Sequence, residues 1–143
     1  MFRFNIKRQT YTVIFHHFIQ GDVVPIYVEN HHHLLDSEKR TVRVGDLDWV
    51  CNDRGECISL LRFSCTSIHD GKIGYNDANE QNNVAVGVSL CHPKDNFSRK
   101  IGRRISFDRA MSNLFPNDAQ KNIRKAVWNK YFQDVEKLNI VKG

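Results

Sequence analysis

Short runs of apolar, β-branched and aromatic residues recur through residues 1–93 and are separated by turn sequences such as Asp53-Arg54-Gly55 and Asp70-Gly71. Runs of this length, bounded by glycine, aspartate and asparagine, are typical of β-strands. The pattern predicts eight strands, at residues 2–7, 10–19, 23–29, 40–44, 48–51, 56–65, 72–75 and 83–91. Many short strands at this spacing favour an antiparallel sheet or a sandwich.

After Pro93 the apolar positions change to a helical period. Phe97, Ile101 and Ile105 recur four residues apart, which predicts a helix over residues 98–114 with these three side chains on its buried face. Asp95, Asn96 and Ser98 are the candidate N-terminal caps.

Pro116 ends this first helix and helps to start a second one. Asn117 or Asp118 can cap the second helix. Its apolar stripe recurs at four-residue intervals: Ile123, Val127, Tyr131 and Val135.

These elements predict an α+β fold, with an N-terminal antiparallel sheet or sandwich core followed by two C-terminal α-helices. A chain of 143 residues is long enough for one hydrophobic core, so we expect a single domain with a β-rich body at 1–93 and a helical segment at 94–143. No apolar run approaches the roughly 20 residues that cross a bilayer, and residues 1–9 lack the pattern of a signal peptide. We therefore expect a cytoplasmic protein without a membrane partner.

The charge is concentrated in the helical segment. The whole chain has a formal net charge of +5, yet residues 94–130 hold ten lysines and arginines against three aspartates, which leaves the rest of the chain slightly acidic. A basic segment on a near-neutral body indicates an anionic partner.

Metal and catalytic motifs are missing from the sequence. The four cysteines contain no C-x-x-C pair, and the adjacent histidines at 16–17 and 31–33 cannot easily converge on one ion. Paired carboxylates, a nucleophile elbow, a phosphate-binding glycine loop and H-E-x-x-H are also lacking. We therefore expect no metal, no cofactor and no enzymatic activity.

The predicted helices offer arginines for an anion. Arg104 and Arg109 flank the predicted apolar stripe of the first helix, and Arg103 lies across from it; a solvated cationic face explains the same residues equally well. In the second helix Arg124 could stack on Trp128, although a tryptophan at this spacing is more often part of a core or an interface.

Residues 87–110 carry a more specific pattern: a strand, then Cys91-x-Pro93-x-Asp95-x-Phe97, and then Gly102, Ile105 and Arg109-Ala110 at fixed intervals. This stretch resembles the phage sponge family that counters the bacterial Thoeris defence, type one. The resemblance implies a protein of the infected bacterial cytoplasm that captures, without cleaving it, a cyclic ADP-ribose signal made by a TIR-domain enzyme. It also implies a homo-oligomer, a dimer or hexamer, with the ligand at the protomer interface. Some members of the family hold cyclic oligonucleotides at a separate site.

The resemblance also implies site residues. Arg109 would face the ligand phosphate, His92 occupies a position that is commonly asparagine, and Asn113 and Asn82 stand where the family has an arginine and an aromatic residue. An earlier family arginine corresponds to Arg62 or Arg54. The expected ligand-binding set is Arg109, His92, Arg104, Phe97, Arg103, Asn113 and Arg62. Two alternatives remain open: a small phage nucleic-acid-binding or regulatory protein that uses the basic helices, and an inhibitor that binds a host protein.

Overall fold

The structure is a computed structural model and describes residues 1–24, 41–44, 47–51, 57–59, 61–72, 83–91, 94, 96 and 98–137. The main sheet has four antiparallel strands in the order β1-β2-β7-β8. Their bounds are β1 (Phe2–Ile6), β2 (Gln9–Phe18), β7 (Phe63–Asp70) and β8 (Asn83–Leu90). Strand β8 therefore forms one edge of this sheet.

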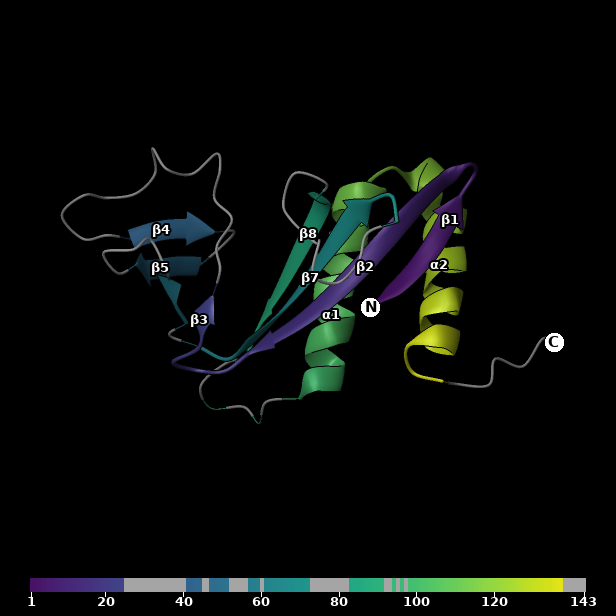
Figure 1. The fold of residues 1–143 in the computed structure, drawn as a ribbon. Coiled ribbons are helices and arrows are strands. Elements are labelled where there is room, and N and C mark those ends of the chain that lie inside the picture. The colour runs from purple at the N-terminus through teal and green to yellow at the C-terminus, as the bar shows by residue number, and fades with distance from the viewer. Residues whose placement is uncertain are drawn as a thin grey trace.

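A second, smaller antiparallel sheet lies beyond one end of the main sheet, as Figure 1 shows. Its strand order is β3-β6-β5-β4. The bounds are β3 (Val23–Val24), β4 (Thr41–Val44), β5 (Leu47–Cys51) and β6 (Cys57–Ile58).

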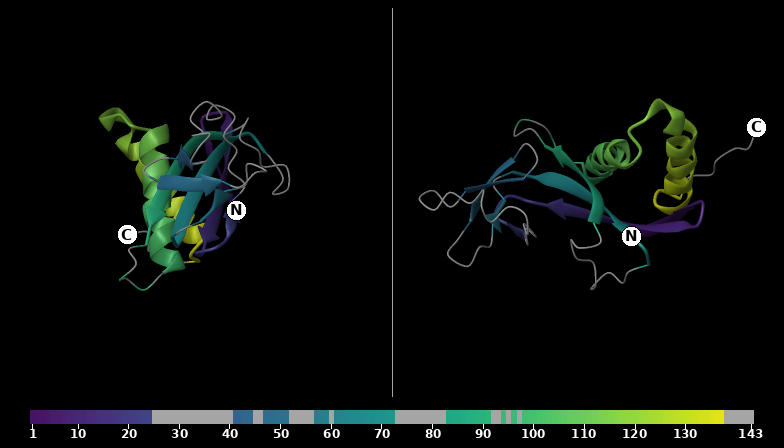
Figure 2. Two further views of the ribbon diagram at one scale, coloured as in Figure 1. Left: turned by 90° about the vertical axis from the view of Figure 1, so that its left-hand side faces the viewer. Right: turned by 90° about the horizontal axis from the view of Figure 1, so that it is seen from above.

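Two α-helices follow the strands and lie on the same face of the main sheet (Figure 2). They are α1 (Arg99–Leu114) and α2 (Lys121–Asp134), joined through a short 3-10 helix at Asp118–Gln120. The predicted α+β fold, with an antiparallel sheet followed by two C-terminal helices, is confirmed. Among the elements that the structure describes, no helix is both long enough and apolar enough to cross a membrane.

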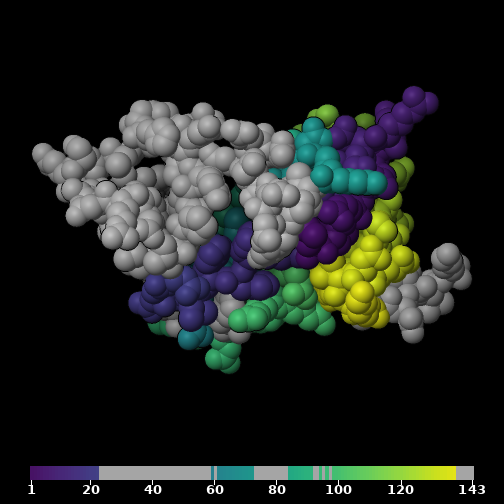
Figure 3. Space-filling model, viewed as in Figure 1, coloured from purple at the N-terminus to yellow at the C-terminus, as the bar shows by residue number. Residues whose placement is uncertain are grey.

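An aromatic core joins the sheet to both helices. Phe2 of β1 packs edge-on against Phe107 of α1 and Tyr131 of α2, at ring-centroid distances of 5.6 and 6.1 Å. Trp128 packs edge-on against Phe107 at 4.8 Å, so it belongs to the packing between the helices. Figure 3 shows the residues of β1 and α2 side by side on the surface of this region.

One predicted strand is wrong. Residues 56–65 do not form a single strand, because Cys57–Ile58 pairs in the small sheet while Phe63–Asp70 pairs with β2 and β8 in the main sheet. The chain passes from one sheet to the other between these strands, and periodicity carries no signal for that change. Of the prediction at 72–75, Lys72 is not in a strand and the rest lies outside the described residues, as does the second part of the prediction at 23–29.

The bounds predicted for the first helix are confirmed, with Ser98 as its N-cap accepting a hydrogen bond from the backbone N–H of Ile101 at 3.2 Å. The predicted buried face is wrong. Ile101 and Ile105 are 59% and 40% exposed, and Phe97 lies outside the described residues. The side chains that face the sheet and α2 lie roughly half a turn away around the helix. They are Gly102, Ser106, Phe107, Ala110 and Met111.

Close approach of α1 to the sheet explains this orientation. A methyl group added at Gly87 of β8 would lie 2.0 Å from the carbonyl oxygen of Ser106 and 2.4 Å from the backbone nitrogen of Ala110. A methyl group added at Gly102 would lie 2.2 Å from Oγ of Ser64 on β7. Only small residues fit at such a contact, so the larger isoleucines are left on the outer side of the helix.

The predicted stripe of the second helix is confirmed. Val127 and Tyr131 are buried, and Ile123 and Val135 pack against the same core. The turn before the 3-10 helix is closed at Asn117, whose backbone N–H donates to the side-chain oxygen of Gln120 at 3.0 Å.

Candidate functional site

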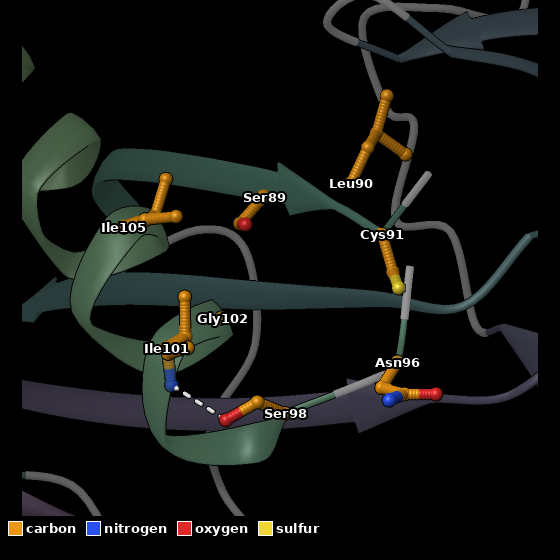
Figure 4. Close-up of a pocket in the computed structure, with 8 residues that line it drawn as sticks. All are labelled: Ser89, Leu90, Cys91, Asn96, Ser98, Ile101, Gly102 and Ile105. Atoms are coloured by element: carbon orange, nitrogen blue, oxygen red, sulfur yellow. Dashed lines mark hydrogen bonds between the residues drawn. The ribbon is translucent and has the colours of Figure 1, made fainter. Parts of the chain in front are cut away.

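A pocket of about 250 Å³ lies where the C-terminal end of β8 meets the N-terminal end of α1 (Figure 4). All of its lining residues fall within the 87–110 motif. They are Ser89, Leu90, Cys91, Asn96, Ser98, Ile101, Gly102 and Ile105. The motif therefore corresponds to one place in the fold.

The pocket has apolar and polar parts. Ile101 and Ile105 form its wall on α1, and Leu90 lies at its rim. The hydroxyl of Ser89 points toward α1, and the thiol of Cys91 points toward Asn96 (Figure 4). Such a mixture can hold a ligand that has both a flat apolar part and polar groups.

The N-terminus of α1 gives the polar end a positive potential. Ser98 uses its hydroxyl for the N–H of Ile101 and its carbonyl for the N–H of Gly102. The first turn contains Arg99 and Lys100 and no acidic residue. Neither side chain lines the pocket, and Lys100 Nζ lies 3.8 Å from Oε1 of Glu136, so the positive potential here comes from the helix terminus.

Arg109 and Asn113 do not line the pocket but bind the edge of the main sheet. Arg109 Nη1 donates to the carbonyl oxygen of Val88 at 2.5 Å, and Asn113 Nδ2 donates to that of Val86 at 2.8 Å. Arg109 and Asn113 are four residues apart on the helix, an advance of about 6 Å, and Val86 and Val88 are two residues apart on the strand, an advance of about 6.8 Å. Because the two advances are similar, side chains on one face of α1 reach alternate carbonyl oxygens of β8. The two side chains thus cap the outer edge of β8, a role that the sequence did not predict.

Arg104 is held by an ion pair. It donates two hydrogen bonds to the carboxylate of Glu136, from Nε to Oε2 at 2.8 Å and from Nη2 to Oε1 at 2.6 Å. The Glu136 side chain is only 3% exposed, and its pKa is lowered by the hydrogen bonds from Arg104. Arg104 therefore connects α1 to the residues that follow α2.

Arg103 also faces α2. Its Nε donates to the hydroxyl of Tyr131 at 3.1 Å, while burial raises the pKa of that tyrosine. On the second helix, Arg124 donates to the carbonyl oxygens of Phe115 and Asn117 at 2.5 and 2.8 Å, and so caps the end of α1. Arg124 therefore contacts backbone carbonyl oxygens, and Trp128 packs against the core, which is the role that its spacing favoured. Three arginines of the basic segment, Arg103, Arg104 and Arg124, therefore hold the helices together.

The other expected site residues are placed as follows. Arg62 is exposed, and its carbonyl oxygen accepts a hydrogen bond from the backbone N–H of Cys91 at 3.0 Å, so its backbone adjoins the pocket. His92 and Phe97 lie outside the described residues, as do Asn82 and Arg54.

The described cysteines and histidines show no metal-binding arrangement. Burial raises the pKa of the Cys65 thiol to about 12, so this thiol stays protonated and unreactive near neutral pH. His17 hydrogen-bonds through Nδ1 to Oγ of Ser64 at 2.8 Å, and burial lowers its pKa. Within the described ranges, no group of three or more histidine, cysteine, aspartate or glutamate residues could hold a metal ion.

Sequence reasoning missed the polar end of the pocket. Ser89 is a small residue inside a strand pattern and carries no signal for ligand binding. Ile101 and Ile105 were expected to be core residues, because their period is that of a buried stripe. Ser89, Ile101 and Ile105 line one cavity only because of the way that α1 is oriented about its axis against the sheet.

Comparison with known proteins adds no relative: no family model matches the chain, and no match was found among curated proteins or solved structures. The function is therefore inferred from the 87–110 motif and from the geometry of the pocket.

Proposed function

We propose that this protein binds and sequesters a cyclic nucleotide immune signal, a cyclic ADP-ribose isomer made by a TIR-domain enzyme, without cleaving it. The observation that carries the proposal is the gathering of the 87–110 motif around one pocket at the N-terminus of a cationic helix. This is the segment that resembles the Thoeris-countering phage sponges. Its role would be to remove the signal before the bacterial effector can respond.

The chemistry of the pocket suits such a ligand. A cyclic ADP-ribose carries an adenine and two anionic phosphates, so its site needs an apolar surface and a positive end. Ile101 and Ile105 provide the surface, and the first turn of α1 provides the positive end. Arg109 has further N–H groups beyond the one bonded to Val88, so it can cap the strand and contact a phosphate together.

The proposal includes a second copy of the chain over the pocket. At about 250 Å³ the pocket is smaller than the roughly 300–1,000 Å³ of small-molecule sites, so one chain encloses only part of a nucleotide. The exposed Ile101, Ile105 and Leu90 give its mouth an apolar rim, which a neighbouring copy would cover. A dimer or hexamer with the ligand between protomers is the assembly that the motif implies.

The experiment is to mix the purified protein with cyclic ADP-ribose isomers, remove free ligand, heat the complex and analyse the released molecules by mass spectrometry. We expect one isomer to be retained and then released intact. A cleaved product would refute the absence of catalysis. Failure to retain any cyclic nucleotide would refute the proposal.

The alternative of a nucleic-acid-binding protein receives less support from the contacts of the basic segment. Arg103, Arg104 and Arg124 are all engaged between the helices, which removes them from an open cationic surface. Binding to a phosphate backbone weakens steeply with salt because counterions are released. Strong, salt-sensitive binding to DNA or RNA, without retention of a cyclic nucleotide, would favour this alternative.

A further inference from the structure

Cys51 and Cys57 occupy directly opposite positions in the small sheet. The antiparallel pairing of β5 with β6 places Val50 against Ile58 and Cys51 against Cys57. Five residues separate the two cysteines in the sequence, which is not the spacing of a C-x-x-C motif, so the strand register is what brings them together. Neither the pocket nor the proposed function uses this pair.

Opposite positions of this kind have the separation that a disulfide bond requires. Residues directly opposite each other in an antiparallel pair have Cα atoms about 4.5 or 5.5 Å apart, depending on whether the two residues exchange hydrogen bonds. Both values lie within the roughly 4.4–6.8 Å that is found across disulfide bonds. The two cysteines can therefore be joined without a change of strand register.

Cys65 and Cys91 do not have such a pairing with each other. Cys65 lies opposite Val88 in the main sheet, and Cys91 follows Val88 by three residues, which is about 10 Å further along the chain. Cysteines whose Cα atoms are more than about 7 Å apart cannot be bridged unless the backbone moves. The raised pKa of the Cys65 thiol also deprives it of the thiolate form that disulfide exchange needs.

A covalent bond between Cys51 and Cys57 would act on an inner strand of the small sheet. Strand β6 has two residues and lies between β3 and β5 in the strand order. Directly after it, the backbone of Ser59 donates to the carbonyl oxygen of Asp22 and accepts from the N–H of Gly21, both at 2.8 Å. Because a strand of two residues can make few ladder hydrogen bonds, a bond from β6 to β5 strengthens the sheet where its pairing is shortest.

We propose that Cys51 and Cys57 form a reversible disulfide bond under oxidation by a low-molecular-weight disulfide such as glutathione disulfide, and that this bond stabilises the small sheet. The proposal does not depend on the proposed function. A reducing cytoplasm keeps both residues as thiols, so the bond forms when conditions become oxidising.

The reaction is an exchange in two steps. The thiolate of one cysteine attacks a sulfur of glutathione disulfide, forms a mixed disulfide and releases one glutathione thiolate. The thiolate of the other cysteine then attacks the protein sulfur of the mixed disulfide and releases the second glutathione thiolate. The two released thiolates take up the two protons that the cysteines lose, and two electrons pass from the cysteines to glutathione disulfide.

The test is peptide mapping of the full chain after incubation with glutathione disulfide, followed by blocking of free thiols with iodoacetamide and denaturation. Trypsin cleaves after Arg54, between the two cysteines, and places the four cysteines in separate peptides at residues 44–54, 55–62, 63–72 and 73–94. We expect peptides 44–54 and 55–62 to be joined, with the loss of two hydrogen atoms, and to separate when dithiothreitol is added. Peptides 44–54 and 55–62 that both carry the blocking group, or that are joined to 73–94 instead, would overturn the disulfide bond.

Serine variants separate this pair from the other thiols. Cys51→Ser should give no joined peptides and should keep glutathione attached at Cys57, because the second attack is then impossible. Cys91→Ser is the matched control and should give the same joined peptides as the unaltered chain. Joined peptides that disappear in Cys91→Ser would contradict the pairing.

Hydrogen exchange measures the effect on the sheet. After oxidation, the amides of β5 and β6 should exchange at least about tenfold more slowly, because the cross-link removes chain entropy from the locally opened sheet. The amides of β2 in the main sheet serve as the internal control and should exchange at the same rate in both forms. Equal exchange of β5 and β6 in the reduced and oxidised protein would overturn the stabilising role.

Discussion

The contact of α1 with the sheet can be tested at Gly102, because a side-chain atom limits the space there. In Gly102→Ala the new methyl group would lie 2.2 Å from Oγ and 3.0 Å from Cβ of Ser64. Alanine in a helix interior is favoured over glycine by about 1 kcal/mol, whereas overpacking a tight contact costs about 1–3 kcal/mol. We expect a net loss of about 1 kcal/mol of stability and an outward shift of the end of α1 that lines the pocket.

Ser64→Ala removes the atom that the new methyl group meets first. Alone, it should cost about 1 kcal/mol, because the hydrogen bond to His17 Nδ1 is lost. Combined with Gly102→Ala it should restore part of the packing, so the double variant should be more stable than additivity predicts by about 1 kcal/mol. Gly87→Ala has no such rescue, since its methyl group would meet backbone atoms of Ser106 and Ala110, and it should cost more than about 3 kcal/mol.

Urea unfolding followed by far-ultraviolet circular dichroism measures these free energies, since loss of the helices reports on unfolding. The double-mutant cycle consists of the unaltered chain, Gly102→Ala, Ser64→Ala and the double variant. These four proteins and Gly87→Ala are measured under the same conditions. Additive effects within the cycle, or a Gly87→Ala variant as stable as the unaltered chain, would refute the close approach of α1 to the sheet.

Three other predictions concern the edge of β8, the ion pair and the assembly. Arg109→Ala and Asn113→Ala should each lower the free energy of unfolding by about 0.5–1.5 kcal/mol, because each removes a hydrogen bond to the edge of β8. Only the arginine variant should lose ligand retention in the mass-spectrometric assay. Equal ligand retention by the two variants would contradict a phosphate contact of Arg109. The pKa of Glu136 is lowered in the folded protein, so its stabilising effect is complete above the ordinary carboxyl pKa of about 4.3 and is lost as the pH falls through the lower folded pKa. In Glu136→Gln the urea midpoint of unfolding should therefore vary less with pH over that acid range. A pH profile equal to that of the unaltered chain would disprove the role of the ion pair. Ile105→Asp should give a monomer in light scattering, because it places a charge on the proposed interface. The control Val84→Asp, at an exposed position near the start of β8, should leave the oligomer unchanged. A monomeric unaltered chain would contradict the proposed assembly.

The order of the elements was predictable because each carries a local signal. Alternation and turn residues located β1, β2, β4, β5 and β8 to within a few residues. The second helix was predicted together with its buried face, since its apolar stripe is regular and meets the core directly. Neither the split of residues 56–65 nor the length of β7 was predictable, because strand partners are chosen by distant segments.

The site was only partly predictable. The motif at 87–110 was found in the sequence. Of the residues that line the pocket, Asn96 and Ser98 were expected to be caps and Ile101 and Ile105 to be core residues, while Ser89 and Leu90 were not singled out. The arginines could be counted but not assigned, because whether a guanidinium meets a carboxylate, a carbonyl oxygen or a ligand depends on what lies opposite. Arg104 meets Glu136, which is 32 residues further along the chain, and Arg109 meets the backbone of β8.

The sequence by itself determined the α+β fold class, the ends of the first helix and the concentration of positive charge after residue 93. These properties depend on neighbours within a few residues, namely hydrophobic period, caps and composition. Only the tertiary structure decided which side of α1 faces the sheet, because Gly87 and Gly102 permit an approach that no larger residue would allow. That rotation exposes Ile101 and Ile105, directs the arginines toward their partners and opens the pocket beside Ser89.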